Sequence, residues 1–179
     1  MNEGLIPRRY AKALYKVAVE RGDDRELYDL MNRLVTTADD QPGLSQAISN
    51  PFVSDSDKIA LLTTAAAAEN DNTFADFLKL LAQNRRLDMT LLIARQYADL
   101  YRHERNIYKV DVVSASPLDS AEEDRLKRMI NSHLNGGSME YVSRVDPDLI
   151  GGFTVSIDNE RLDASVRNEL KQLRLNLLK

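Results

Sequence analysis

The sequence predicts a mainly α protein, with an N-terminal six-helix bundle followed by a small α/β (α+β) C-terminal domain. Two observations lead to this prediction. Apolar residues recur at helical spacing from residue 5 to about residue 105, and after that point they alternate at the period of a β-strand. We therefore expect one domain over residues 1–105 and a second over residues 106–179, both within the usual size range of small domains.

Turn residues separate the first three predicted helices. Gly22 follows the first helix, as glycine often does at a helix C-terminus. The second helix begins near Asp24 and is broken by the Pro-Gly pair at 42–43. A short third helix ends before Asn50 and Pro51, because a residue before proline avoids helical backbone angles.

Capping residues mark the next three helices. Ser54 is expected to cap the fourth, with Asp57 three residues later near the positive end of the helix dipole. Asp71 or Asn72 opens the fifth helix, and the sixth begins near Asp88. No segment up to this point alternates cleanly, so residues 1–105 predict helices joined by short turns.

The remaining residues mix strands with helices. Alternating stretches predict strands at residues 108–112, 139–145 and 153–157, with a short fourth strand at 161–162. A capping box that begins at Ser120 with Glu122 and Glu123 opens one helix. Asp163 or Ser165 caps a final, leucine-rich helix.

Composition excludes several classes of protein. The chain has no cysteine, which rules out disulfides and thiolate chemistry, and its net charge of −4 argues against a nucleic-acid binder. The N-terminus lacks the apolar core of a signal peptide. The longest uncharged apolar run, Ile59 to Ala68, is about half of the roughly 20 residues that a membrane-spanning helix needs. We expect a protein made in the cytoplasm, with no direct membrane insertion.

The sequence offers no catalytic, cofactor-binding or metal-binding residues. His103 and His133 have no motif partner, and the carboxylates are numerous enough to pair by chance. Gly151 and Gly152 could hold a phosphate, but an alternating strand follows them instead of a helix. A role in backbone geometry at the start of that strand is therefore the better interpretation. A small hydrolase that uses a carboxylate pair stays an alternative, and it predicts a deep pocket lined by carboxylates with perturbed pKa values.

Two helices are apolar on more than one face. They are the first, which contains Tyr10 and Leu14, and the sixth, which contains Leu91 and Ala98. These faces either fill the core of the bundle or form a groove for an amphipathic helix from a partner.

The chain resembles the delta subunit family of F-type ATP synthases, the bacterial relatives of the mitochondrial oligomycin-sensitivity-conferral protein. The most specific stretch is Met139-x-Tyr141-x-x-x-Val145-Asp146-x-x-Leu149-x-Gly151-Gly152-Phe153-x-Val155. Further matches are Arg9-Tyr10-Ala11-Lys12-Ala13-Leu14, Asn50-Pro51 before Lys58, Phe77-Leu78, Asn84-Arg85-Arg86-Leu87 and Leu162-Asp163-Ala164-Ser165-Val166-Arg167. The resemblance covers essentially the whole chain.

This resemblance implies a non-catalytic stator subunit, one copy per complex, without cofactors. It would link the alpha/beta catalytic head to the b-subunit stalk, so that proton-driven rotor rotation drives ATP synthesis. Residues 1–105 would hold an N-terminal helix of an alpha subunit, and residues 106–179 the C-terminal end of the b-subunit stalk. The implied location is the cytoplasmic side of the bacterial cell membrane, as a peripheral protein.

In this family the alpha-subunit helix lies between the first and fifth long helices. Because the third predicted helix is short, we expect the fifth long helix to be the sixth one predicted here. The candidate contact residues are therefore Tyr10, Ala11, Leu14, Leu91, Ala94 and Ala98. For the stalk contact we expect the last helix. An RNA-binding transcription adaptor built on a similar bundle is the alternative, and the charge balance disfavours it.

Overall fold

The computed structural model of the chain describes residues 4–68, 71–134, 136–158 and 160–177. The chain divides into two compact units, Met1–Arg102 and His103–Lys179. The division falls within the last turn of a helix, Thr90–Arg105, just before the point where the periodicity of the sequence changes.

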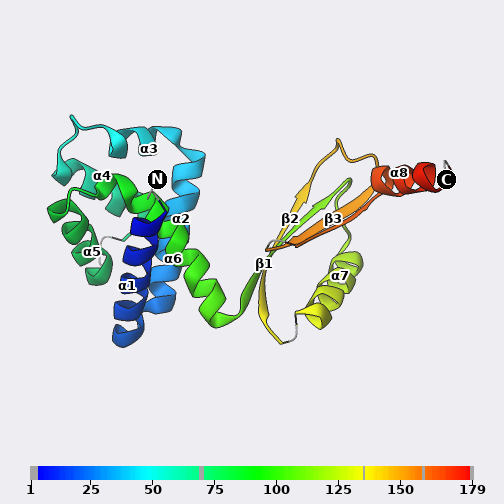
Figure 1. The fold of residues 1–179 in the computed structure, drawn as a ribbon, viewed down its shortest axis with the longest axis horizontal. Helices are drawn as coiled ribbons and strands as arrows, with labels where there is room; N and C mark the ends of the chain where they lie inside the picture. The colour runs from blue at the N-terminus through cyan, green and yellow to red at the C-terminus, as the bar shows by residue number, and fades with distance from the viewer. Residues whose placement is uncertain (1–3, 69–70, 135, 159, 178–179) are drawn as a thin grey trace. The chain divides into compact units, whose positions relative to one another are not determined.

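The first unit is an all-helical bundle (Figure 1). Its elements are α1 (Leu5–Arg21), α2 (Asp24–Asp40), α3 (Pro42–Ser49), α4 (Asp55–Ala66), α5 (Asn72–Gln83), a short 3₁₀ helix η1 (Leu87–Met89) and α6 (Thr90–Arg105). The 3₁₀ turn precedes α6, so α6 begins two residues later than the sequence predicts.

Local chemistry accounts for three of the helix ends in this unit. Gly22 adopts a left-handed backbone with φ of 78°, and its N–H donates to the Ala18 carbonyl at 2.8 Å, which closes α1. Ser54 Oγ accepts from the Asp57 N–H at 3.2 Å at the start of α4. At the start of α5, Asp71 Oδ1 accepts from the backbone N–H three residues later at 2.8 Å.

The core of this unit rests on α2 and α6. The side chains of Leu27, Met31 and Leu34, at helical spacing on α2, are fully buried. The ring of Tyr28 stacks on that of Tyr101 with centroids 4.3 Å apart. Aromatic contacts therefore join α2 to α6, in a chain where aromatic residues are otherwise scarce.

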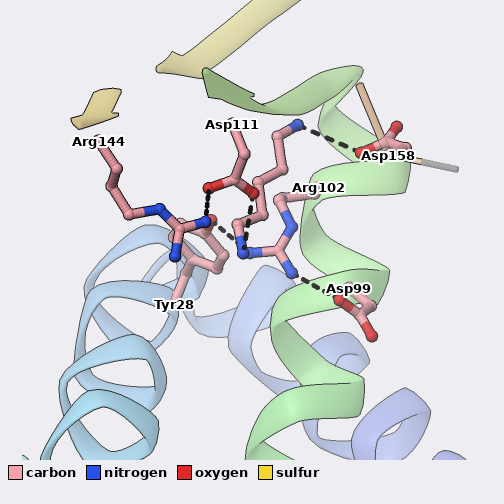
Figure 2. Close-up of polar contacts among 7 residues, drawn as sticks. Tyr28, Asp99, Arg102, Asp111, Arg144 and Asp158 are labelled. Atoms are coloured by element: carbon pink, nitrogen blue, oxygen red, sulfur yellow. Dashed lines mark hydrogen bonds and ion pairs between the residues drawn. The ribbon is translucent and has the colours of Figure 1, made fainter. Parts of the chain in front are cut away.

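Arg102 adds a polar contact at the edge of this core. Its guanidinium donates to the Tyr28 hydroxyl at 3.2 Å and to Asp99 Oδ1 at 2.5 Å (Figure 2). It also lies 6.0 Å from the centroid of the Tyr28 ring. The planar guanidinium thus fixes the last turns of α6 to α2.

The second unit is a sheet with helices (Figure 1), and the sheet has four strands. Its elements are β1 (Ile107–Ser114), α7 (Ser120–His133), β2 (Ser138–Val145), β3 (Gly152–Ile157), β4 (Glu160–Ser165) and α8 (Val166–Leu177). The strand order is β2-β1-β3-β4, with β1 parallel to β2 and the other neighbouring pairs antiparallel. Together with the helical first unit, this confirms the predicted fold class.

One face of the sheet is apolar and carries α7. Val110, Val112 and Val155 from the sheet pack with Leu126 and Ile130 of α7. The side chains between these residues point to the other face of the sheet, and that face carries a cluster of charged groups on β1 and β2. There Asp111 Oδ1 lies 3.1 Å from Arg144 Nη2 (Figure 2). The other carboxylate oxygen, Asp111 Oδ2, lies 3.6 Å from Lys109 Nζ.

The capping box of α7 begins one residue earlier than the sequence predicts. Asp119, not Ser120, is the N-cap. Asp119 Oδ1 accepts from the Glu122 N–H at 2.7 Å, and Glu122 Oε2 accepts from the Asp119 N–H at 3.1 Å. At the last helix, Ser165 Oγ accepts from the Asn168 N–H at 3.3 Å.

No helix among the described residues is long and apolar enough to cross a membrane.

Candidate partner-binding site

An apolar groove lies on the surface of the bundle, between α1 and α5. Its volume is about 180 Å³. It is lined by Tyr10, Ala13, Leu14, Val17 and Arg21 of α1 and by Thr73, Asp76, Phe77 and Leu80 of α5. A mostly apolar groove flanked by two helices has the character of a site that receives a third helix.

The floor of the groove is buried and its rims are exposed. Leu14 and Phe77 are almost completely buried, so they also belong to the core of the bundle. Val17, one turn further along α1, is 40% exposed, and Leu80 of α5 is 47% exposed. α5 contributes both to the core of the bundle and to the groove. Phe74, on another face of the helix, is fully buried in the core, whereas Leu80 is not. The side chains at the rims are therefore left facing the solvent.

One end of the groove is polar. Arg21 Nη1 donates to Thr73 Oγ1 at 3.0 Å, and Thr73 Oγ1 donates to Asp23 Oδ2 at 2.5 Å. Asp76 Oδ2 lies 4.0 Å from Arg21 Nη1. The end of α1, the residue before α2 and the start of α5 are thus connected by hydrogen bonds at the mouth of the groove.

The six residues predicted from the sequence do not form one surface. Tyr10 and Leu14 line the α1–α5 groove. Leu91 is partly buried on α6, and Ala11 is buried. Ala94 is 0% exposed and Ala98 is 2% exposed, so neither can reach a partner while the bundle keeps this packing.

The faces of α1 and α6 contact each other through aromatic rings. Tyr15 of α1 meets the ring of Tyr97 edge-on with centroids 6.1 Å apart, and that of Tyr101 with centroids 6.4 Å apart. The α1–α5 groove is also lined by Ala13, Val17, Phe77 and Leu80, which were not among the candidates. For Phe77 and Leu80 a signal exists in the sequence, because α5 carries more large apolar residues than one buried face can hold.

A second apolar groove, of about 480 Å³, lies in the C-terminal unit between α7 and the β3–β4 hairpin. It is lined by Met129, Ile130, Ser132, His133, Val155, Ile157, Glu160, Arg161 and Leu162. Met129 and Leu162 are each more than half exposed. The last helix, α8, likewise exposes Leu170 and Leu173. The C-terminal unit therefore has exposed apolar side chains on three of its elements, α7, β4 and α8.

The glycine pair before β3 serves backbone geometry. Gly152 has φ of 78°, and a Cβ atom there would lie 2.3 Å from the Ala164 carbonyl oxygen of the neighbouring strand. The Gly151 carbonyl accepts from the Val166 N–H at 3.0 Å, and that of Gly152 from the Ala115 N–H at 3.1 Å. The interpretation as a strand entrance, where another backbone approaches closely, is confirmed.

Titratable groups do not gather into a reactive centre in the part of the chain that the structure describes. No cluster of three or more His, Asp or Glu side chains there could hold a metal ion. The pKa of Tyr97 is raised well above its usual value because the ring is buried in the bundle core. This phenol donates to the Asp24 carbonyl at 3.1 Å and has a structural role.

Known proteins resemble this chain over nearly its full length. The profile of the family described as "ATP synthase delta (OSCP) subunit" matches residues 6–177. ATP synthase subunit delta of Parabacteroides distasonis is 35% identical over 178 residues, which cover 99% of this chain and 98% of the relative. The protein of the same name from Bacteroides thetaiotaomicron is 36% identical and covers 97% of this chain and 94% of its own.

The fold has a solved counterpart. A chain in the cryo-EM structure of the Toxoplasma gondii mitochondrial ATP synthase hexamer matches with a TM-score of 0.73 at 21% identity, over 97% of each chain. This agreement across the sequence leaves the RNA-binding adaptor without support. The chain belongs to the ATP synthase delta (OSCP) subunit family and is a non-catalytic, peripheral-stalk subunit of that enzyme.

Proposed function

We propose that the α1–α5 groove is where this stator subunit holds an amphipathic helix from the N-terminus of an alpha subunit of the catalytic head. The observation that carries the proposal is the groove itself, with a buried floor at Leu14 and Phe77 and exposed apolar rims at Val17 and Leu80. An amphipathic helix would place side chains at i, i+3, i+4 and i+7 along it.

Such a contact suits a subunit that works under load. The lifetime of a complex is governed mainly by its dissociation rate, and buried apolar anchors lower that rate more than charges at the rim do. The groove offers such anchor points on both walls. Of the six residues expected from the sequence, Tyr10 and Leu14 stay in this proposal, and Ala13, Val17, Phe77 and Leu80 join them.

The test is a titration of the full chain with a synthetic peptide of the cognate alpha subunit's N-terminal segment, followed by fluorescence anisotropy. Leu80→Glu, on a rim of the groove, is expected to raise the Kd at least about tenfold, because the charge would have to be buried. Leu92→Glu is the matched control, since Leu92 lies on α6 beside Leu91 and is 49% exposed against 47% for Leu80. It is expected to change the Kd by less than about twofold.

Two results would contradict this placement. An unchanged Kd for Leu80→Glu would remove the groove from the interface. Weaker binding by Leu92→Glu alone would return the site to α6. Absence of binding by the wild-type chain, with its circular dichroism intact, would reject the contact with the alpha-subunit segment as a whole.

For the C-terminal unit, we propose that the exposed apolar face of α8 and the groove between α7 and β4 receive the C-terminal end of the b-subunit stalk. Leu170 and Leu173 are exposed on α8, and Leu162 is exposed at the groove. Capture of a purified C-terminal fragment of the b subunit by the full chain tests this. Leu162→Arg and Leu173→Arg are each expected to weaken the capture, and Arg174→Leu, beside Leu173, serves as the control.

With both contacts made, the chain would connect the head to a membrane-anchored stalk and keep the head from turning with the rotor. We place it on the cytoplasmic side of the bacterial cell membrane, in one copy per complex. Native mass spectrometry of the detergent-purified enzyme measures the copy number, and two copies would contradict the proposal.

A further inference from the structure

A chain of hydrogen bonds spans three elements at one end of the α1–α5 groove. Thr73, in the first turn of α5, is 5% exposed, and its hydroxyl accepts from Arg21 of α1 while it donates to Asp23, the residue before α2. A hydroxyl has one proton to donate, and here it is used on a carboxylate. Both bonds join the hydroxyl to charged groups, which makes them stronger than bonds between neutral groups.

The same residues belong to the groove. Arg21 and Thr73 both line it, and Asp76, one turn further along α5, lies 4.0 Å from Arg21. Along the rest of the groove, α1 and α5 present apolar surface to the solvent. At this end, in contrast, directional bonds connect the two helices. The position of α5 relative to α1 is therefore fixed where these bonds form.

Asp23 makes the arrangement sensitive to loss of the hydroxyl. Its Oδ1 atom is buried and accepts no hydrogen bond among the described residues. The bond from Thr73 to Oδ2 is thus an important source of compensation for a partly buried carboxylate. Without it, the carboxylate would turn toward water, and the corner between α1 and α2 would move with it.

We propose that Thr73 is a positioning residue: held between Arg21 and Asp23, it sets the spacing of α1 and α5 and so determines how tightly the groove binds its helix. This inference rests on the proposed contact with an alpha-subunit helix. α5 itself stays anchored without the hydroxyl, because Phe74 and Leu78 are fully buried in the bundle. Loss of the hydroxyl should therefore change the groove and leave the bundle folded.

Two substitutions at Thr73 separate the hydroxyl from the shape of the side chain. Thr73→Val keeps the shape and removes both bonds, and it is expected to raise the Kd for the alpha-subunit peptide about tenfold. Thr73→Ser keeps the hydroxyl and is expected to bind as the wild type does. All titrations use the full chain, with circular dichroism as the check on folding.

The spacing of the helices can be measured directly. Because the chain contains no cysteine, nitroxide labels at Lys16→Cys on α1 and Gln83→Cys on α5 are unique. Both positions are exposed. Double electron–electron resonance on the peptide-free chain is expected to give a broader or shifted distance distribution with Thr73→Val than with the wild type, and an unchanged one with Thr73→Ser.

A second pair of variants covers the case in which Thr73→Val does not fold. Arg21→Met removes the donor to Thr73 at a side chain that is half exposed, so it should not unfold the bundle. It is expected to weaken peptide binding and broaden the distance distribution. Lys12→Met removes the same charge from an exposed position of α1 that does not line the groove, and it should have neither effect.

The outcomes are distinct. Wild-type affinity and spacing in Thr73→Val and Arg21→Met overturn the inference. The inference is also overturned if Thr73→Ser weakens peptide binding as much as Thr73→Val does. It is overturned, too, if Thr73→Val or Arg21→Met weakens binding while the distance between α1 and α5 stays unchanged. If the wild-type chain does not bind the peptide, the proposed contact with the head fails, and the distance measurements alone then decide whether Thr73 sets the spacing.

Discussion

Tyr97 shows how a single buried polar group links the stability of the bundle to pH. Its ring is fully buried and its hydroxyl donates to the Asp24 carbonyl at 3.1 Å. Burial raises the pKa of this phenol, and the nearby Asp24 and Asp23 carboxylates raise it further. The folded chain therefore keeps this proton at pH values at which the unfolded chain has released it.

We expect the free energy of unfolding to fall as the pH rises above about 10, where the phenol ionises in the unfolded chain. Tyr97→Phe should flatten this decline and cost roughly 1 kcal/mol at neutral pH, because it removes the hydrogen bond. Urea denaturation between pH 7 and pH 11 measures both effects. Tyr10→Phe, at the groove, controls for the loss of a tyrosine, and an equal effect of the two variants would contradict the prediction.

Gly152 is a second residue at which the structure requires one amino acid, because a side chain there would collide with the neighbouring strand. Gly152→Ala would put a methyl group 2.3 Å from the Ala164 carbonyl oxygen, on a backbone with φ of 78°. We expect it to lower the free energy of unfolding by about 2 kcal/mol or more, through strain and the displacement of β4. Gly4→Ala is the control, because a Cβ atom there meets nothing within 4 Å. Similar unfolding curves for the two variants would contradict this account.

At the scale of the element, two neighbouring residues at the start of α7 should differ in their contribution to stability. Asp119→Ala removes the capping interaction with the Glu122 N–H, and we expect it to cost about 1 kcal/mol. Ser120→Ala, one residue later, should change stability by no more than about 0.5 kcal/mol, because Ser120 is already inside the helix. Chemical denaturation followed by circular dichroism compares them, and a larger effect at Ser120 would return the cap to that residue.

Helices and their caps could be predicted because their signals are local. Gly22 and Ser54 act within three or four residues of themselves, and both cap the helices that the sequence indicated. Of the two residues predicted to open the fifth helix, Asp71 is the N-cap. The cap of α7 was misjudged by one residue because Asp119 and Ser120 are both good capping residues, and only the backbone conformation decides between them.

The groove could not be predicted in the same way, because it depends on contacts between distant elements. Periodicity shows that α1 and α6 are apolar on more than one face, but it does not show which faces meet. Ala94 and Ala98 are buried in the bundle, while Leu80 of α5 is left exposed. Choosing among them requires knowledge of which helices pack together, and small apolar residues look the same at a core contact and at a docking site.

At the scale of the whole molecule, the chain carries two separate cores. Leu81 belongs to the buried interior of Met1–Arg102, whereas Val112 packs against α7 within His103–Lys179. Each core is made from residues of its own unit. The stability of one unit should therefore respond weakly to a cavity in the other.

Leu81→Ala should lower the free energy of opening in the first unit by about 2–5 kcal/mol through the cavity that it leaves. Amide hydrogen exchange on the full chain is expected to show lost protection in α2 and α6, with the protection of β1 unchanged. Val112→Ala is the reciprocal variant and should affect β1 and β3 alone. Parallel loss of protection in both units with either variant would mean that the chain unfolds as one.

The central position of β1 in its sheet has a consequence for the order in which the chain folds during synthesis. β1 pairs with β2 and with β3, both of which follow it in the sequence. When β1 leaves the ribosome, both of its edges are open and its apolar side chains lack a partner layer. The helices before it form from local contacts and can assemble while the rest is being made. The nascent chain would then carry a finished bundle ahead of an unfinished strand, so chaperones that bind exposed apolar segments should contact it most strongly between the synthesis of β1 and that of β3.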